Sequence, residues 1–434
     1  MINQTLVDSI QAMSTRKWYG KVTRVVGLTI ESTGPIAAVG DICFIHSGRD
    51  GSGRIQAEVV GFKESNVLLM PFSDTVEIAP GNLVECTEKP LSVPVGHSLI
   101  GQIIDAVGQP LTSSNMQDPV EWVPVEQSPP NPLQRPRITE RLGLGVRVID
   151  GLFSVGKGQR MGIFAGSGVG KSTLLAMIAK YSTADVNVIA LIGERGREVK
   201  DFVERDLGEE GMKKTVLLVV TSDQPALMRV KGALTATAVA EYFRDQGLSV
   251  NLMMDSVTRF AMAQREIGLA IGEPPTTKGY PPSVFAMLPK LLERSGTNEH
   301  GSITAFYTVL VDGDDMNEPI ADAVRGILDG HLVLDRQLAN KGQFPAIHVL
   351  KSVSRVMSDI VSTQHLTAAA TLRELLSIYT DAEDLISIGA YKRGSNAKLD
   401  EAVAAHPDIL TFIKQATNEQ VTFDETERHL VGRF

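Results

Sequence analysis

The chain has 434 residues and is 43% hydrophobic, which is enough for two or three domains with cores of their own and excludes a disordered protein. Its formal net charge of -9 at pH 7 argues against a surface built mainly to neutralise a nucleic-acid backbone. Two cysteines in a long chain suit a reducing compartment better than a disulfide scaffold, with a single bridge as the alternative. No apolar run is long enough to span a bilayer, and we expect a cytoplasmic protein.

Two different patterns occupy the first 88 residues. Residues 1–16 carry apolar side chains at a helical spacing, but the segment is too short to be stable alone, so it is either a frayed end or a partner-binding helix. Residues 17–88 contain short runs of alternating apolar residues, such as DICFI and QAEVVGF, broken by Gly, Pro and Asp. Closely spaced strands of this kind predict a small β-barrel.

An α/β pattern extends from residue 89 to residue 362. A proline-rich connector, SPPNPLQRPRI at 128–138, leads into alternating strand and helix segments. The strands are continuous apolar runs such as VNVIALIG, which is typical of a parallel sheet buried on both faces. Over residues 363–434 the strands stop, and segments such as LDEAVAAHPDILTFIKQ predict a terminal domain of amphipathic helices.

The segment GIFAGSGVGKST at 162–173 predicts a phosphate-binding loop between a strand and a helix that opens at Ser172. Such a loop needs small residues whose amides converge at a helix N-terminus. We expect Lys171 to reach the β- and γ-phosphates and Ser172 to bind Mg²⁺. The usual first glycine is replaced by Ala165, which is tolerable if its φ is negative. The other predicted phosphate-binding residues are Gly166, Ser167, Gly168, Val169, Gly170 and Thr173.

Two acidic residues follow buried strands of the predicted sheet. Asp255 ends VNLMMD, where a carboxylate can hold Mg²⁺ through water, although it could instead cap the next helix. Glu194, followed by Arg195, ends the run VNVIALIGE at the carboxyl edge of the sheet, where ligands bind. We predict that Glu194 orients or deprotonates the attacking water; its alternative is a helix-start glutamate that contacts amides.

Several long stretches resemble the ATPases of bacterial type III protein export, and most closely the flagellum-specific family, itself related to the catalytic subunit of rotary ATP synthases. They include GIFAGSGVGKSTLLAMIA, LIGERGREVKDFVE, MMDSVTRFAMAQREIG and PAIHVLKSVSR. The resemblance covers nearly the whole chain. It implies a RecA-like P-loop NTPase core with a β-barrel before it and a helical domain after it, and it makes alanine an ordinary residue at position 165.

The same resemblance implies roles for individual residues. Glu194, 23 positions after Lys171, matches the catalytic glutamate, and Arg195 matches its neighbour in the motif. Arg355 matches an arginine that enters the neighbouring subunit's nucleotide site, and Phe344 matches an aromatic residue that stacks on adenine. Without the resemblance, Arg355 could belong to a surface ion pair and Phe344 to the core.

An arginine supplied by a neighbouring copy contributes about a thousandfold or more in rate, so a monomer should be nearly inert. A repeated head-to-tail contact closes into a ring, and the resemblance implies a homohexamer that binds ATP and Mg²⁺. It further implies a regulatory or stator-like protein at the N-terminal segment, a central stalk-like protein, chaperone–substrate complexes and membrane proteins of the export gate. Membrane association would then occur only through partners. The stretch GAYKRGSN at 389–396 replaces the acidic lever of the synthases, so we do not expect synthase-like torque transfer.

Three other functions compete with flagellar export. The first is an ATPase of a virulence injectisome, which no chemical argument separates from a flagellar one. We favour flagellar export because the sequence resembles that family more closely. A non-catalytic nucleotide-binding ring subunit is disfavoured because this chain keeps Glu194. A nucleic-acid translocase is disfavoured because the barrel offers only scattered Phe44, Phe62 and Phe72 among several acids, and no basic and aromatic platform.

Overall fold

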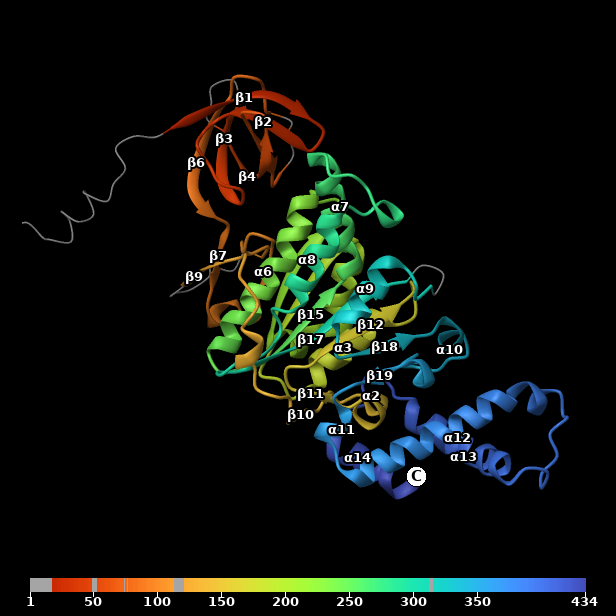
Figure 1. Ribbon diagram of the computed structural model, residues 1–434. Coiled ribbons are helices and arrows are strands. Elements are labelled where there is room, and N and C mark those ends of the chain that lie inside the picture. The colour runs from red at the N-terminus through yellow and green to blue at the C-terminus, as the bar shows by residue number, and fades with distance from the viewer. Residues whose placement is uncertain (1–17, 49–52, 74, 76, 113–120, 312–314) are drawn as a thin grey trace, which may run out of the picture.

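The computed structural model describes residues 18–48, 53–73, 75, 77–112, 121–311 and 315–434, so the predicted partner-binding segment 1–16 lies outside the described residues. Figure 1 shows a β-barrel at one end of the molecule, an α/β core in the middle and a helical domain at the other end. The predicted order of the three parts is confirmed. No helix among the described residues is both long enough and apolar enough to cross a bilayer.

The first part is a closed barrel with the strand order β1-β2-β5-β4-β3-β6. Its strands are β1 (Tyr19–Val26), β2 (Thr29–Thr33), β3 (Asp41–Ser47), β4 (Gly53–Lys63), β5 (Asn66–Pro71) and β6 (Leu83–Pro90). The alternating apolar residues predicted from the sequence fill the interior, with Ile30, Ile45 and Val59 fully buried. Because closure pairs every strand, the barrel leaves no open edge.

A nine-stranded sheet forms the core, with the order β19-β18-β12-β17-β15-β13-β14-β8 and β16 paired to β17 beside this path. The central strands are parallel. The strands are β8 (Ile103–Ile104), β12 (Arg160–Ala165), β13 (Val186–Glu194), β14 (Thr215–Thr221), β15 (Ser249–Asp255), β16 (Gly296–Thr297), β17 (Ser302–Leu310), β18 (Gly330–Leu334) and β19 (Val353–Ser354). Two short two-stranded sheets flank the core: β7 (Ser92–Val95) with β9 (Glu121–Pro124), and β10 (Arg141–Leu142) with β11 (Val155–Gly156).

Helices cover both faces of this sheet. One face packs against α6 (Ala226–Asp245), α7 (Val257–Ile271), α8 (Pro282–Leu292) and α9 (Pro319–Ile327). The other packs against α2 (Arg147–Leu152) and α3 (Lys171–Tyr181). Alternate residues of β13 belong to opposite apolar clusters, as Ala190 and Leu191 do, which explains why residues 188–192 form an uninterrupted apolar run.

The remaining α-helices of the described residues are four short segments around the core and the three helices of the helical domain. They are α4 (Gly196–Asp201), α5 (Gly208–Met212), α10 (Arg336–Asn340), α11 (Met357–Ile360), α12 (Thr363–Ser387), α13 (Ala397–Ile413) and α14 (Phe423–Arg433). The long helices α12 and α13 pack against each other, and α14 contacts both α12 and α2. The helical domain is therefore seated on the core.

A buried ion cluster joins the barrel to the core. Lys231 of α6 places Nζ 2.6 Å from Glu58 Oε2 of β4 and 2.6 Å from Glu126 Oε1, which follows β9. Burial raises the pKa of Glu58 and the charge of Lys231 opposes that shift. Burial alone would lower the pKa of Lys231, but the two carboxylates raise it, so the lysine stays charged.

We expect Lys231→Met to destabilise the protein by about 3–5 kcal/mol, because it leaves a buried carboxylate without its counter-charge. Urea denaturation followed by circular dichroism measures the loss. Lys398→Met is the matched control, because the Lys398–Glu374 ion pair is exposed and should contribute nothing measurable. Equal stability of the two variants would contradict a stabilising role for the buried cluster.

Candidate functional site

The predicted phosphate-binding loop lies between β12 and α3, at the carboxyl edge of the sheet. Helix α3 begins one residue earlier than expected, at Lys171. Gly168 and Gly170 have φ angles of 76° and 90°, which other residues adopt only with strain. Ala165 does not belong to the described non-glycine residues with positive φ, so it meets the condition set for it from the sequence.

Three strands bring Lys171 together with the two predicted acids. Its Nζ lies 2.5 Å from Asp255 Oδ1 and 3.4 Å from Glu194 Oε1. The parallel register places Leu191 of β13 opposite Asp255 of β15, so both strands deliver their carboxylates to the same edge. The predicted grouping of a lysine, a strand-end aspartate and a strand-end glutamate is present in the structure.

Burial makes these charges act strongly on one another. Burial alone would lower the pKa of Lys171, but Asp255 and Glu194 raise it, so the ammonium group stays protonated. Asp255 is only 2% exposed, and burial raises its pKa while Lys171 and the hydroxyl of Thr308 counteract the shift. A permanently charged ammonium group beside a glycine loop suits the binding of a polyphosphate.

Phe344 lies beside the loop. A Cβ atom added at Gly170 would be 3.6 Å from two atoms of the Phe344 ring. The residue is 47% exposed, so its ring is not part of the core. Gln415, from the helical domain, donates its backbone N–H to the carbonyl of Phe344 at 3.0 Å, so this ring lies where core and helical domain meet. An exposed ring next to a phosphate loop is placed to stack on a planar base.

Ser172 and Thr173 occupy the first turn of α3, and the side chain of Ser172 is exposed. A hydroxyl at this position and the carboxylate of Asp255 are oxygen ligands of the kind that Mg²⁺ prefers, and Mg²⁺ usually keeps several waters and binds few protein groups. The residues therefore fit a magnesium ion held chiefly by a nucleotide's phosphates.

Arg195 and Arg355 are not brought to the loop within this chain. Arg195 is exposed and its Nη1 lies 3.4 Å from Glu198 Oε1. Arg355 is exposed and donates its backbone N–H to Asp329 O at 3.0 Å, level with the start of β12. The loop follows the other end of β12, about 16 Å away at the rise of a strand. This is farther than an arginine side chain extends.

Two contributors were missed from the sequence. Thr308 of β17 donates its hydroxyl to Asp255 Oδ1 at 2.8 Å, a contact that only the strand order reveals. Arg259 of α7 packs its side chain against Gly193, directly before Glu194, and its Nε is buried with no hydrogen-bond partner in the described part of the chain. Its position four residues after Asp255, in the first turn of α7, was the available signal.

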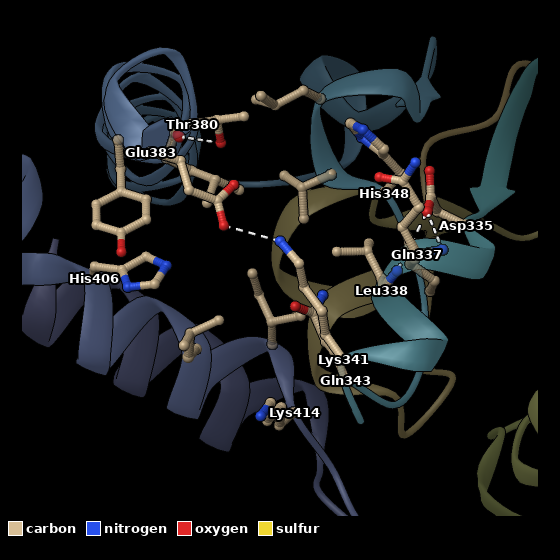
Figure 2. A pocket seen from close by; sticks show the side chains of 17 residues that line it. Asp335, Gln337, Leu338, Lys341, Gln343, His348, Thr380, Glu383, His406 and Lys414 are labelled. Carbon is tan, nitrogen blue, oxygen red and sulfur yellow. Dashed lines mark hydrogen bonds and ion pairs between the residues drawn. The ribbon is translucent and has the colours of Figure 1, made fainter. Parts of the chain in front are cut away.

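A separate cavity of about 270 Å³ lies between the α10 region and helices α12 and α13 (Figure 2). Lys341 and Glu383 form an ion pair of 2.8 Å across it, and the rings of Tyr379 and His406 stack with centroids 3.5 Å apart. Its lining includes Gln343, the neighbour of Phe344, so the cavity adjoins the segment that carries Phe344. The lining includes none of the phosphate-loop residues, so the cavity is not the phosphate site.

Known proteins resemble this chain in sequence. Residues 22–88 and 145–354 match the beta-barrel and nucleotide-binding domains of the ATP synthase alpha/beta family, and residues 361–431 match the T3SS EscN ATPase C-terminal domain. The flagellum-specific ATP synthase of Bacillus subtilis (strain 168) is 64% identical over 98% of this chain and 97% of its own length. The type 3 secretion system ATPase of Xanthomonas euvesicatoria is 48% identical over 98% of this chain and 96% of its own.

Solved structures agree with these matches. The assembled ATPase EscN from the enteropathogenic E. coli type III secretion system superposes with a TM-score of 0.89 at 46% identity, covering 95% of this chain and 98% of EscN. EscN in complex with its central stalk EscO superposes with a TM-score of 0.87, at the same identity and coverage. The likeness includes the barrel, the core and the helical domain.

We expect Glu194→Gln to retain nucleotide binding and to lower ATP hydrolysis by about 100-fold or more, because the amide cannot take a proton from water. Phosphate release and the binding of a fluorescent ATP analogue measure the two properties separately. Glu210→Gln, which changes an exposed carboxylate of α5, should keep the full rate. Normal hydrolysis by Glu194→Gln would exclude this residue as the base.

Proposed function

This chain belongs to the ATP synthase alpha/beta family, as one of its type III protein export ATPases, and we propose that it hydrolyses ATP in sites shared between neighbouring copies of a homohexamer. Its activity is that of an ATPase of type III export, and the 64% identity to a flagellum-specific relative favours the flagellar system over an injectisome. In the proposal, hydrolysis drives or gates chaperone release, unfolding and export of flagellar proteins.

One observation carries the shared-site proposal: Arg355 lies at the end of the sheet opposite its own phosphate loop. It is exposed and therefore available to another molecule. A cation that approaches the γ-phosphate from outside the parent site stabilises the charge that develops during phosphoryl transfer. The solved relative described as an assembled ATPase supports a ring of identical chains. In such a ring each copy lends Arg355 to the next.

The remaining roles follow from the geometry of the loop. Loop amides and the ammonium group of Lys171 bind the phosphates, and Phe344 stacks on the adenine. Glu194 lies at the carboxyl edge, 3.4 Å from the lysine, where a carboxylate can accept a proton from water aligned on the γ-phosphate. Ser172 and Asp255 would hold Mg²⁺, which neutralises phosphate charge when bound.

Arg195 has a less direct place in this proposal. Its side chain is 82% exposed and, among the residues that the structure describes, pairs with Glu198 alone, so any contact with nucleotide would be made in the assembled ring. Unlike Lys171 and Glu194, which lie together at the loop of one chain, Arg195 would therefore act only in the assembled ring.

Partners are proposed from the ends of the chain. The solved complex of EscN with its central stalk EscO supports a stalk-like partner. The last turn of α12 presents Leu385 and its C-cap presents Ile388, which are 52% and 74% exposed, beside the basic stretch 389–396 that leads to α13. We assign this tip to partner contact and residues 1–16 to a regulatory protein. Chaperone–substrate complexes and the export gate at the inner membrane complete the proposed partners, with no role for nucleic acid.

A non-catalytic nucleotide-binding subunit is the alternative function. It would need no carboxylate beside the loop lysine, whereas Glu194 and Asp255 both contact Lys171 in this chain. The geometry therefore favours catalysis.

Mixing Lys171→Ala chains with Arg355→Ala chains tests the shared site. Each variant alone should be nearly inactive, and the mixture should recover activity because one copy supplies the phosphate loop and its neighbour supplies the arginine. Phosphate release after co-assembly is the measurement. No recovery, in rings shown by mass photometry to contain both chains, would contradict the proposal.

The ATPase rate per chain should also rise with protein concentration. Dilution separates the copies and removes the arginine from each site, at a cost of about a thousandfold or more in rate. Arg355→Ala should lose this dependence and stay at the monomer rate. A fully active isolated chain would disprove the shared site.

A further inference from the structure

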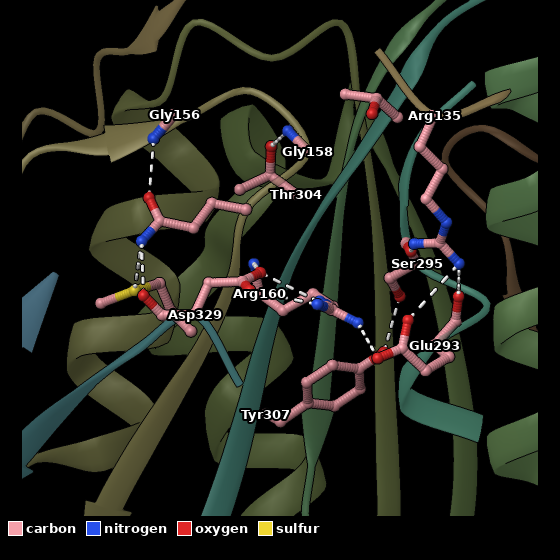
Figure 3. Close-up of polar contacts among 12 residues, drawn as sticks. Arg135, Gly156, Gly158, Arg160, Glu293, Ser295, Thr304, Tyr307 and Asp329 are labelled. Carbon is pink, nitrogen blue, oxygen red and sulfur yellow. Dashed lines mark hydrogen bonds and ion pairs between the residues drawn. The ribbon is translucent and has the colours of Figure 1, made fainter. Parts of the chain in front are cut away.

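A polar cluster occupies the end of the sheet that lies opposite the phosphate loop (Figure 3). Arg160, the first residue of β12, binds the Asp329 carboxylate through Nε at 2.9 Å and Nη2 at 3.1 Å. Its Nη1 lies 2.6 Å from Glu293 Oε1, and Arg135 of the proline-rich connector donates to Ser295 O at 2.8 Å. The cluster thus ties β12 to the segment before β18, to the end of α8 and to the connector.

Gln159 precedes Arg160 and is fully buried. Its Oε1 accepts the backbone N–H of Gly156 at 2.9 Å. Its Nε2 donates to Asp329 O at 3.2 Å and to Ser354 Oγ at 3.0 Å. A buried amide is costly unless its hydrogen bonds are made, and the two that Nε2 donates to Asp329 and Ser354 go to residues far away in the sequence.

These contacts converge on the segment that carries Arg355. The carbonyl of Asp329 accepts both the Gln159 amide and the backbone N–H of Arg355. Ser354, the residue before Arg355, accepts from Gln159 and donates its hydroxyl to Ser154 O at 2.9 Å. Strand β19 has only two residues and, among the described strands, pairs with β18 alone.

We propose that Gln159 is a positioning residue for Arg355: its side-chain amide holds Ser354 and the Asp329 carbonyl so that Arg355 projects from a fixed backbone toward the neighbouring copy. The inference rests on the proposed function, in which Arg355 acts in the neighbour's nucleotide site. The carboxyl end of β12 then leads to the phosphate loop of the chain's own site. Its amino end follows Gln159, which supports the arginine that acts in the neighbour's site.

Removing the amide should impair catalysis without impairing nucleotide binding. Gln159→Met keeps a side chain of similar length but loses the hydrogen bonds to Gly156, Asp329 and Ser354. A displacement of about 1 Å costs on the order of 100-fold in rate at a site that depends on alignment, so we expect kcat to fall at least about tenfold. The affinity of the chain's own loop for a fluorescent ATP analogue should stay within about twofold, because that loop lies at the far end of β12.

Mixed rings separate a positioning role from a general loss of structure. A Gln159→Met chain has an intact loop, so Lys171→Ala chains, which carry an intact Arg355 and Gln159, should rescue it. Arg355→Ala chains should not rescue it, because in that mixture no copy supplies a well-placed arginine. The inference is overturned if Arg355→Ala rescues Gln159→Met, or if Lys171→Ala does not.

The pair Lys171→Ala with Arg355→Ala is the reference mixture. If that pair fails to recover activity, the proposed shared site is wrong; if it recovers and Gln159→Met with Lys171→Ala does not, only the inference about Gln159 is wrong. Ser354→Ala is a second variant for use if Gln159→Met does not fold. Lys171→Ala chains should rescue Ser354→Ala, and Arg355→Ala chains should not. Ser354→Thr keeps the hydroxyl and should restore the rate.

Thr304→Val is the matched control at the same end of the sheet. Its hydroxyl accepts the backbone N–H of Gly158 at 2.9 Å and contacts neither Asp329 nor Ser354. Thr304→Val should therefore keep kcat near that of the unmodified chain. If kcat of Thr304→Val fell as far as that of Gln159→Met, any disturbance of this region would have the same effect, and the assignment to Gln159 would be overturned.

Discussion

The polarity of the parallel sheet is the constraint on which the rest of this structure depends. Because β12, β13 and β15 run in the same direction, the loop, Glu194 and Asp255 meet at one edge. The same polarity places Arg355, which follows the antiparallel β19, at the opposite edge. A single chain therefore holds both halves of the proposed catalytic machinery but cannot bring them together. The proposed assembly into a ring would bring the two halves together.

The loop edge is organised by charges that are taken out of water. Lys171 contacts two carboxylates, and Thr308 fixes one of them by a hydrogen bond. Burial strengthens these electrostatic interactions, and the two carboxylates keep the lysine charged although burial alone would lower its pKa. A polyphosphate that enters such a site meets a positive charge already in place, so little reorganisation is needed at the moment of reaction.

The barrel and the helical domain are both coupled to this core through specific contacts. Lys231 holds the barrel by a buried ion cluster, and Gln415 of the helical domain contacts the segment that carries Phe344. The proposed adenine contact thus lies at a domain boundary, where movement of the helical domain would change the nucleotide site. Helix α13 connects the exposed tip, which precedes it, to Gln415, which follows it by two residues.

The sequence by itself determined the order of the three parts, the loop, and the identity of Lys171, Glu194 and Asp255. These features depend on local periodicity and on motif spacing, which are properties of neighbouring residues. Only the tertiary structure decided that Thr308 supports Asp255, that Arg195 stays on the surface, and that Gln159 reaches Asp329 and Ser354, which are 170 and 195 positions away. Those contacts depend on strand order and register, which are set by the burial of whole strands against one another and leave no mark in any short stretch of sequence.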